Sequence, residues 1–274
     1  MRIVLLVNDN PYNAQAFRKL CLSRHSEIVA IVFSTRILAG KNFSFLQALR
    51  WLLDLSGPQL FLFRAIEVYA YKWRRLWKHF GFYRNRFDMI EFAKANGIPI
   101  VYSTNVNAPD FLARFRAFEP DLAVSRINQI LKKKIIEIPK MGMINSHSSL
   151  LPKYKGIDGV FWGMVNGDRE FGTTSHFIVE KLDSGGVIAQ EAVHLDSLTS
   201  GISLHGLEDV LNELSAEMLN SVVSVFARGE KPASVPMSEV GASYFSFATR
   251  EGYRRFKSRG HRLIGIHELL KLFL

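Results

Sequence analysis

The sequence predicts an α/β fold built on a doubly wound, mostly parallel sheet, and three observations favour this class. The first is a pair of apolar, β-branched runs at residues 2–8 and 28–34, each suited to a buried strand. The second is an amphipathic pattern from about Asn13 to Ser23 between these runs, which is typical of a crossover helix. The third is that this alternation continues along the chain. Further strands are expected at 98–102, 121–126 and 141–146, and further helices at 87–96, 109–118 and 131–137.

A second group of elements follows these strands. Residues 158–166 suit a helix, 172–179 and 187–195 suit strands, and 201–227 suit a long amphipathic helix packed on the sheet. In an open α/β sheet, ligands bind outside the carboxyl ends of the strands. Asn8, Asn128 and Asn145 fall at such ends, so a polar site is expected there.

Length and composition indicate an enzyme-sized globular chain. With 274 residues, 48% of them hydrophobic, it can bury a large core. We expect a main domain over 1–230 and a C-terminal extension over 231–274. Cys21 is the only cysteine, which excludes an intramolecular disulfide and a cysteine-based zinc site. The first apolar run ends at Asn8-Asp9 without a small-residue cleavage site, so it predicts a strand rather than a signal peptide, and a cytoplasmic location is expected.

Two basic segments carry the excess charge. Residues 38–86 form an aromatic-rich insertion, and the part from Arg64 to Arg86 holds seven Lys or Arg against one acid. Residues 250–262 add six Lys or Arg against one acid, so the rest of the chain is nearly neutral although the formal net charge is +10. A basic aromatic helix is typical of a membrane surface, of a nucleic-acid interface, or of long side chains that cover a core. No stretch predicts a transmembrane span, because charges and Gly57-Pro58 interrupt residues 51–71.

The segment Asn145-Ser146-His147, which follows the short apolar run Gly142-Met143-Ile144, carries the chemistry. Alternation along a strand sends Asn145 and His147 to the same side, and the Leu-Leu-Pro that follows Ser149 must leave the sheet because proline has no N–H. Asp183 stands further on, in Asp183-Ser184-Gly185-Gly186. Acyl transfer to an amine needs an oxyanion donor, a proton-moving group and a group that orients it. Asn145, His147 and Asp183 suit these roles in that order.

These motifs resemble the folate-dependent formyltransferase family, which includes glycinamide ribonucleotide, methionyl-tRNA and amino-sugar formyltransferases. The family pattern Asn-x-His-x-Ser-Leu-Leu-Pro with a later Asp-x-Gly is present in full. Flanking matches occur at Glu119 to Leu122, Asn128 to Leu131, Asn166 to Asp168 and Gly172 to Thr174. The resemblance covers about residues 95 to 195 closely and the first 35 loosely. It implies a Rossmann-like formyltransferase fold, with the 38–86 segment as a helical insertion and 231–274 as a short C-terminal extension.

The resemblance also implies roles for individual residues. Asn145, His147 and Asp183 are the expected catalytic residues, and 10-formyltetrahydrofolate is the expected co-substrate. Its pterin is expected beside the backbone of the residues around the site: Asn128, Gln129, Ile130, Leu131, Ile178 and Asp183, with Leu150, Leu151 and Pro152 at the border. Residues that contact the acceptor or support the site from behind are expected among Asn8, Asn10, Tyr12, Ser149 and His176. No metal is expected, because no His, Cys or carboxylate cluster has ligand spacing.

Several of these residues have a structural alternative. Asn10, directly before Pro11, suits a helix cap better than an acceptor contact. Asp183 is also typical of an Asx turn, and this turn and the catalytic role are compatible. His176 lies on an alternating segment and suits either support of the site or a hydrogen-bonded place in the core. Ser146 and Ser148 depart from the family pattern, at positions where an apolar residue and a Pro or Ala are usual.

We therefore expect an N-formyltransferase that acts on a primary or hydroxylated amine of a small molecule, such as a nucleotide amino sugar or an amino-acid-derived amine. A methionyl-tRNA formyltransferase-like enzyme and a catalytically silent folate-binding relative are the alternatives. The turn after the first strand lacks the glycines of the ribonucleotide branch, which argues against purine synthesis. DNA is not expected as a partner and RNA is disfavoured, because the C-terminal segment is too short for a tRNA-binding barrel. A peripheral membrane contact and a homodimer remain open.

Overall fold

The computed structural model describes residues 1–36, 41, 43–78 and 87–273, and it confirms the predicted fold class. Seven strands form one sheet in the order β3-β2-β1-β4-β5-β7-β8. They are β1 (Ile3–Val7), β2 (Ile28–Ser34), β3 (Ile100–Ser103), β4 (Leu122–Arg126), β5 (Met143–His147), β7 (Glu170–Phe177) and β8 (Val187–His194). The first five in sequence are parallel, and β7 and β8 add antiparallel strands beside β5.

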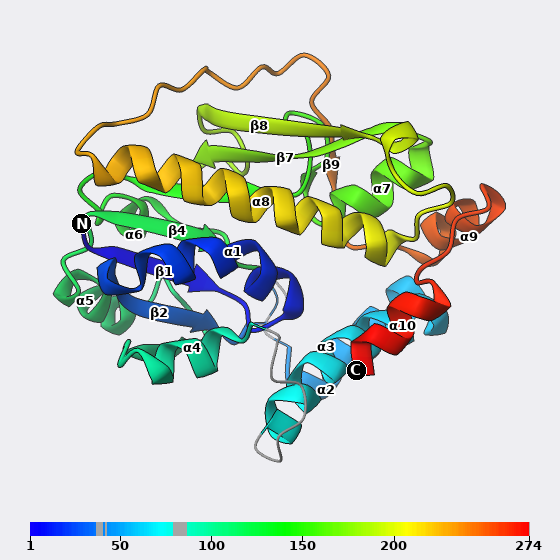
Figure 1. Cartoon of the computed structure of the whole chain (residues 1–274), viewed down its shortest axis with the longest axis horizontal. Helices are drawn as coiled ribbons and strands as arrows, with labels where there is room; N and C mark the ends of the chain where they lie inside the picture. The colour runs from blue at the N-terminus through cyan, green and yellow to red at the C-terminus, as the bar shows by residue number, and fades with distance from the viewer. Residues whose placement is uncertain (37–40, 42, 79–86, 274) are drawn as a thin grey trace.

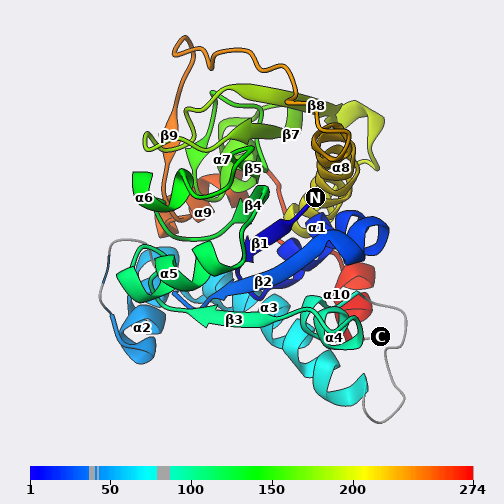
Figure 2. The ribbon, with the colours of Figure 1, turned by 90° about the vertical axis from the view of Figure 1, so that its left-hand side faces the viewer.

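Helices cover both faces of the sheet (Figures 1 and 2). On one face lie α1 (Pro11–Arg24), α4 (Met89–Ala95) and α8 (Leu204–Ala227), and on the other lie α5 (Pro109–Ala117) and the short α6 (Lys133–Ile136). Ile3 and Leu5 of β1 pack towards the first group, whereas Val4 and Leu6 pack towards the second. All of β1 is buried, which is the physical reason for its continuous apolar run.

Local signals set the start of α1 as predicted. The Asn10 side chain accepts a hydrogen bond of 2.8 Å from the Asn13 backbone N–H, and Pro11 occupies the first helical position. This arrangement satisfies a donor that the helix itself cannot pair. Asn10 is therefore a helix cap, and the prediction that it caps the helix rather than contacts an acceptor is confirmed.

The 38–86 insertion contains two helices, α2 (Phe45–Ser56) and α3 (Pro58–Lys78), while its residues 38–40, 42 and 79–86 lie outside the described part. Two of its arginines are engaged within the protein rather than displayed for a partner. Arg75 donates to Asp9 at 2.7 and 3.1 Å and to Asp88 at 2.8 Å, and Arg74 donates to the carbonyl of Lys271 at 2.6 Å. Lys72, in contrast, is exposed.

The C-terminal extension returns to the body of the protein. Beyond α8 the chain arches over β8 and reaches β9 (Tyr244–Phe245), which pairs in parallel with β6 (Lys155–Gly156) (Figure 1). Next, α9 (Arg250–Ser258) packs beside α7 (Gly159–Asn166), where Phe256 stacks on Phe161 at 5.4 Å between ring centroids. The last helix, α10 (Ile266–Phe273), lies against α3. The division of the chain at residue 230 stays a prediction.

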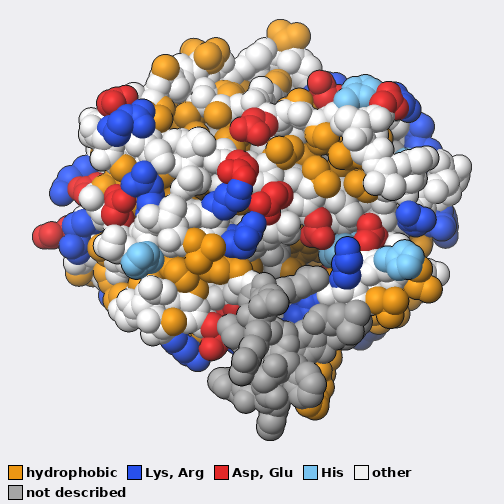
Figure 3. All heavy atoms as spheres, in the orientation of Figure 1, with side chains coloured by type: hydrophobic (Ala, Val, Ile, Leu, Met, Phe, Trp, Pro, Cys, Tyr) orange, Lys and Arg blue, Asp and Glu red, His pale blue; other side chains and the backbone are white. Residues whose placement is uncertain are grey.

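The surface mixes charges of both signs. Figure 3 shows acidic and basic side chains interspersed on one face, with hydrophobic side chains at the lower right, where Figure 1 draws α10. Ile266 and Leu270 of α10 are 72% and 54% exposed. None of the helices in the described ranges is long and apolar enough to cross a membrane.

The Arg75 contacts generate a stability prediction. Arg75→Gln should lower the free energy of unfolding by about 2 kcal/mol, because it leaves two largely shielded carboxylates without their cation. Urea denaturation measures this change. Lys72→Gln, an exposed cation on the same helix, serves as the control and should change stability by less than about 0.5 kcal/mol. Equal effects of the two substitutions would show that Arg75 does not fasten the insertion.

Candidate active site

Asn145 and His147 lie at the carboxyl end of β5, where the sheet changes from parallel to antiparallel pairing. Asn145 is level with Ser125 of β4 on one side and with His176 of β7 on the other. Ile144 and Ser146 are buried, while Asn145 and His147 are partly exposed, as strand alternation requires. The chain leaves the sheet after His147, so both side chains stand at an open edge.

His176 orients the carboxamide of Asn145. The Nδ1 of His176 is 2.8 Å from the carbonyl oxygen of Phe177, and a carbonyl only accepts, so Nδ1 carries the hydrogen. The Nε2 is then an acceptor, and it receives one amide N–H of Asn145 at 3.2 Å. Burial, together with the neighbouring His147, lowers the pKa of His176 to about 4, so the imidazole is neutral near pH 7. Because this hydrogen bond fixes the carboxamide plane, it also fixes the direction of the second amide N–H of Asn145.

His147 is held by a backbone carbonyl rather than by a carboxylate. Its Nε2 lies 2.9 Å from the carbonyl oxygen of Tyr154, so Nε2 carries the hydrogen in the neutral ring and Nδ1 is left as the basic nitrogen. Ser149 supports the same turn, because its hydroxyl donates to the carbonyl of Lys153 at 2.9 Å. The expectation that Asp183 would hold His147 does not match this geometry.

Asp183 instead faces His176. One carboxylate oxygen accepts the Gly156 backbone N–H at 2.8 Å, and the other lies 3.8 Å from Nε2 of His176. Asp183 has a φ of 44°, in the left-handed region that few side chains adopt. The turn also needs Gly185, because a Cβ there would lie 1.8 Å from the carbonyl oxygen of Phe177. The Asp-x-Gly spacing therefore follows from a close backbone approach to the end of β7.

A small cavity of about 70 Å³ opens on this cluster. Its floor is polar and includes Asn145, His176 and Asp183, and its walls are mainly apolar. The walls comprise Ile127, Ile130, Leu131, Ile178, Val179 and Leu182. Ile130, Val179 and Leu182 are 54%, 43% and 39% exposed, and the exposed Glu180 lies among them, so the rim is apolar apart from one carboxylate. Such a rim is typical of a ligand site.

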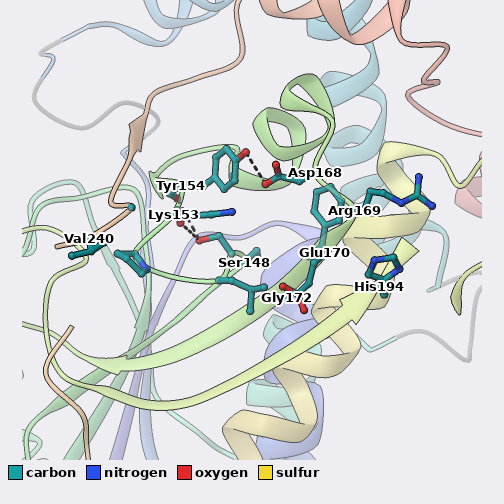
Figure 4. A pocket seen from close by; sticks show the side chains of 15 residues that line it. Ser148, Lys153, Tyr154, Asp168, Arg169, Glu170, Gly172, His194 and Val240 are labelled. Carbon is teal, nitrogen blue, oxygen red and sulfur yellow. Dashed lines mark hydrogen bonds between the residues drawn. The ribbon is translucent and has the colours of Figure 1, made fainter. Parts of the chain in front are cut away.

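The structure places most residues predicted to contact the co-substrate beside one of two cavities, while Asn128 and Leu151 line neither of them. Gln129, Ile130, Leu131, Ile178 and Asp183 line the small cavity, although the Gln129 carboxamide also binds Val106 and Ser34. Leu150 and Pro152 line a different cavity of about 520 Å³ on the far side of the 148–154 turn (Figure 4). Ser149 borders that larger cavity too, and Leu151 is buried behind it. The expected border of Leu150, Leu151 and Pro152 on the pterin site is thus not part of the small cavity.

The larger cavity is built differently from the small one. Figure 4 shows Lys153 pointing into it and the hydroxyl of Tyr154 donating to Asp168, a bond of 2.8 Å. Arg169 and Glu170 add further charges to the lining, and His194 adds an imidazole. The carbonyl of Tyr154 bonds to His147, which is not among the residues that line the small cavity.

The remaining predicted residues have structural partners. Asn8 joins three strand ends: its amide donates to the Ser34 carbonyl at 2.9 Å, and its oxygen accepts the Asn128 N–H at 2.8 Å. Tyr12 donates its hydroxyl to Glu67 and accepts from Arg64 at 2.6 Å. Asn8, Asn128 and Tyr12 therefore shape the edge through these contacts.

Sequence reasoning missed the two backbone groups at Tyr154 and Gly156, and it missed Arg126. No side-chain pattern marks a backbone contact, although the glycine at 156, with a φ of 100°, indicates a special turn. Arg126 had a signal, because a charged residue directly after the buried run Leu122 to Ser125 is unusual. Within the described ranges, no three His, Cys, Asp or Glu side chains gather as metal ligands, and metal independence stays a prediction.

The buried imidazole generates a pH prediction. The unfolded pKa of a histidine is about 6.5 and the folded pKa of His176 is about 4, so only the unfolded chain gains this proton between those values. Stability supplied by the neutral ring is present above about pH 6.5 and is lost as the pH falls towards 4. Relative to His176→Asn, the wild type should lose about 2 kcal/mol of unfolding free energy between pH 7 and 5, measured by urea denaturation. Parallel pH profiles would contradict a buried, neutral His176.

Known proteins of similar sequence are formyltransferases. The Formyl transferase family matches residues 86–223. The methionyl-tRNA formyltransferase of Clostridioides difficile (strain 630) is 35% identical over 150 residues, which cover 54% of this chain and 48% of that protein. The enzyme of the same name from Pelotomaculum thermopropionicum is 36% identical over 141 residues, covering 51% and 44%. The chain thus spans about half the length of the curated relatives it matches.

Solved structures are similar in fold. A sugar 3N-formyl transferase, crystallised in the presence of dTDP and 5-N-formyl-THF, has a TM-score of 0.55 at 17% identity, covering 90% of this chain and 70% of that one. A phosphoribosylglycinamide formyltransferase from Anaplasma phagocytophilum has a TM-score of 0.56 at 15% identity, covering 90% and 98%. The names of the sequence relatives do not support the expectation that RNA is disfavoured as a partner. Because the family match spans half of the chain and contains Asn145, His147, His176 and Asp183, the protein belongs to the formyl transferase family.

Proposed function

We propose that the protein transfers the formyl group of 10-formyltetrahydrofolate to a primary or hydroxylated amine of a small molecule. The observation that carries this proposal is the pairing of Asn145 with a neutral His176. One amide N–H is used in that pair, and the second is free to meet a charge that develops at the cavity. Asp183 lies within 3.8 Å of the same imidazole, so an amide donor and a carboxylate converge on one spot.

The small cavity suits one edge of the co-substrate. A pterin is flat and heteroaromatic, and a cavity of about 70 Å³ is too small to enclose it, so its polar edge would enter the cavity while its faces lie on the apolar side chains at the rim. Ile130, Leu131 and Ile178 would pack on the ring, and the backbone of 128–131 and 178–183 would pair with its nitrogens. When bound, 10-formyltetrahydrofolate supplies an activated formyl group and leaves as tetrahydrofolate.

The residues of the chain then have separate tasks. Asn145 would donate an N–H to the negative charge on the formyl oxygen as the amine adds to the formyl carbon. The amine must lose a proton, and Nδ1 of His147 or the carboxylate of Asp183 would accept it, directly or through water. His176 is a positioning residue, because it acts through Asn145.

Formylation of methionyl-tRNA is the second candidate, favoured by the names of relatives that are 35–36% identical over about half of this chain. A catalytically silent folate-binding protein is the third. Incubation with 10-formyltetrahydrofolate and each class of acceptor separates them: nucleotide-linked amino sugars, amino-acid-derived amines, and initiator methionyl-tRNA. Tetrahydrofolate release is followed by absorbance and the formylated product by mass spectrometry, with EDTA present because no metal is expected. Formylation of methionyl-tRNA alone would overturn the small-molecule proposal, and donor binding without any product would support the silent relative.

Removing the carboxamide should affect turnover far more than binding. Asn145→Ala should lower kcat by about 100- to 1,000-fold with donor binding retained, because the lost donor acts on charge formed during the reaction. Steady-state kinetics on the identified acceptor measures this. Asn96→Ala, which removes an exposed amide at the end of α4, is the matched control and should keep wild-type turnover. A less than tenfold loss in Asn145→Ala would remove Asn145 from the chemistry.

A second prediction concerns Gly185. A methyl group there would meet the carbonyl of Phe177, so Gly185→Ala should push the turn away from β7 and carry the Asp183 carboxylate with it. We expect kcat to fall by at least about tenfold, since a small displacement of a catalytic group has large effects. Gly201→Ala is the control: its φ of 65° strains the backbone, but a Cβ there would meet nothing within 4 Å, so it should cost stability and leave kcat unchanged. Unchanged kinetics in Gly185→Ala would show that the turn does not aim Asp183.

A further inference from the structure

A cluster of charged side chains lies at the carboxyl edge of the sheet, next to the catalytic residues. It draws on distant segments: Tyr12 of α1, Arg64 and Glu67 of the insertion helix α3, Arg126 at the end of β4, and His205 and Glu208 of α8. Figure 1 shows α3 beyond the tips of the strand arrows, at the end of the sheet where an acceptor would enter. The formyl-transfer chemistry proposed above uses none of these residues.

The carboxylates of this cluster already have partners. Arg64 donates to both oxygens of Glu208, at 2.6 and 2.7 Å, and to Glu67 at 3.1 Å. Glu67 also accepts from the hydroxyl of Tyr12 and lies 2.6 Å from Nδ1 of His205. Every carboxylate oxygen of Glu67 and Glu208 therefore has a donor of its own.

Arg126 does not share in this pairing. Its Nη2 donates to the hydroxyl of Ser148 at 2.6 Å, whereas its Nη1 is shielded from solvent and has no hydrogen-bond partner among the described residues. Glu208 is close enough for its charge to raise the pKa of Arg126, but burial dominates and lowers that pKa to about 10. The guanidinium thus keeps its charge near pH 7 while lacking an acceptor for Nη1. Native proteins rarely leave such a donor unpaired without a role for it.

The guanidinium lies near the carboxyl end of β5, but on the other face of the sheet from Asn145. Ser125 is level with Asn145, so strand alternation sends the next side chain, that of Arg126, to the face covered by α1 and α8. Its partner Ser148 directly follows His147, and Arg126 and Ser148 are both partly exposed. An arginine fork suits a planar or tetrahedral oxyanion, which accepts two N–H groups together.

We propose that Arg126 binds an anionic group of the acceptor, so that the amine formylated by this protein also carries a carboxylate or a phosphate. This inference rests on the proposed function for the identity of the ligand as acceptor. The anion replaces the Ser148 hydroxyl and accepts from Nη1, and the acceptor reaches around the carboxyl end of β5 so that its amine meets Asn145 and His147. The ion pair of Arg64 with Glu208 keeps the nearest carboxylate away from Arg126 and so leaves the site open for the substrate.

The first test is anion binding without turnover. Potassium phosphate and potassium acetate are added to the full-length protein at equal ionic strength against potassium chloride, and the unfolding temperature is recorded. Phosphate, acetate or both at 50 mM should raise it by about 2–4 °C in the wild type and in Arg254→Met, an exposed arginine on α9. The rise should be absent in Arg126→Met. The anion that stabilises identifies the group. No rise in the wild type, or an equal rise in Arg126→Met, overturns the site.

The second test is kinetic and uses the acceptor found by screening. Arg126→Met should raise the acceptor KM by about 10- to 100-fold with the donor KM unchanged, the effect expected for a lost charge-assisted hydrogen bond. Arg126→Lys keeps the charge without the fork and should raise it less, and it replaces the methionine variant if that one does not fold. A kcat loss shared by all acceptors with KM unchanged assigns Arg126 to positioning Ser148 and overturns the proposal. Absence of any formyl transfer, together with Arg126-dependent anion stabilisation, rejects the proposed function but keeps the anion site.

Discussion

Two backbone groups in one turn hold two of the three catalytic candidates, and the active-site edge depends on them. The carbonyl of Tyr154 fixes the ring of His147, and two residues later the N–H of Gly156 fixes the carboxylate of Asp183. The turn is itself fastened by the C-terminal extension, because Lys155 and Ile157 donate to the carbonyls of Ser243 and Phe245. A strand about ninety residues away in sequence therefore sets the position of groups that never touch it. Buried backbone donors and acceptors must be paired, so this turn has little freedom to move.

His176 carries the second constraint, because it must stay neutral to do its work. A protonated ring would present N–H groups on both nitrogens, and Asn145 would lose its acceptor. Burial beside β5 keeps the ring neutral, and the carbonyl of Phe177 fixes which nitrogen bears the hydrogen. Asp183, 3.8 Å away, opposes that effect because a carboxylate stabilises the protonated form. Burial dominates here, so the carboxylate can stand close to the site without charging the imidazole.

The sequence predicted those features that depend on local pattern. Strand alternation placed Asn145 and His147 on one side, and Asn10 before Pro11 predicted the helix cap. Contacts between residues that are far apart in the sequence could not be predicted from such local patterns. Nothing near Asp183 indicates Gly156 as its partner, and nothing near Leu150 to Pro152 indicates that these residues border a second cavity. The charge count also misled: Arg74 and Arg75 belong to a basic segment in sequence, yet in the fold they join α3 to α10, α4 and the turn after β1.

The insertion therefore has a closer relation to the site than its position outside the matched motifs suggests. Arg75 fastens α3 to the turn after β1. About three turns earlier in the same helix, Arg64 reaches into the cluster at the carboxyl edge. Arg64 pairs with both oxygens of Glu208, the carboxylate whose charge raises the pKa of Arg126. The Nη1 of Arg126 has no acceptor among the described residues, and this donor belongs to the sheet although the insertion helix occupies the nearby carboxylate. If Arg126 binds the acceptor as proposed, an inserted helix can change which acceptor is bound while the catalytic candidates Asn145, His147 and Asp183 stay in place.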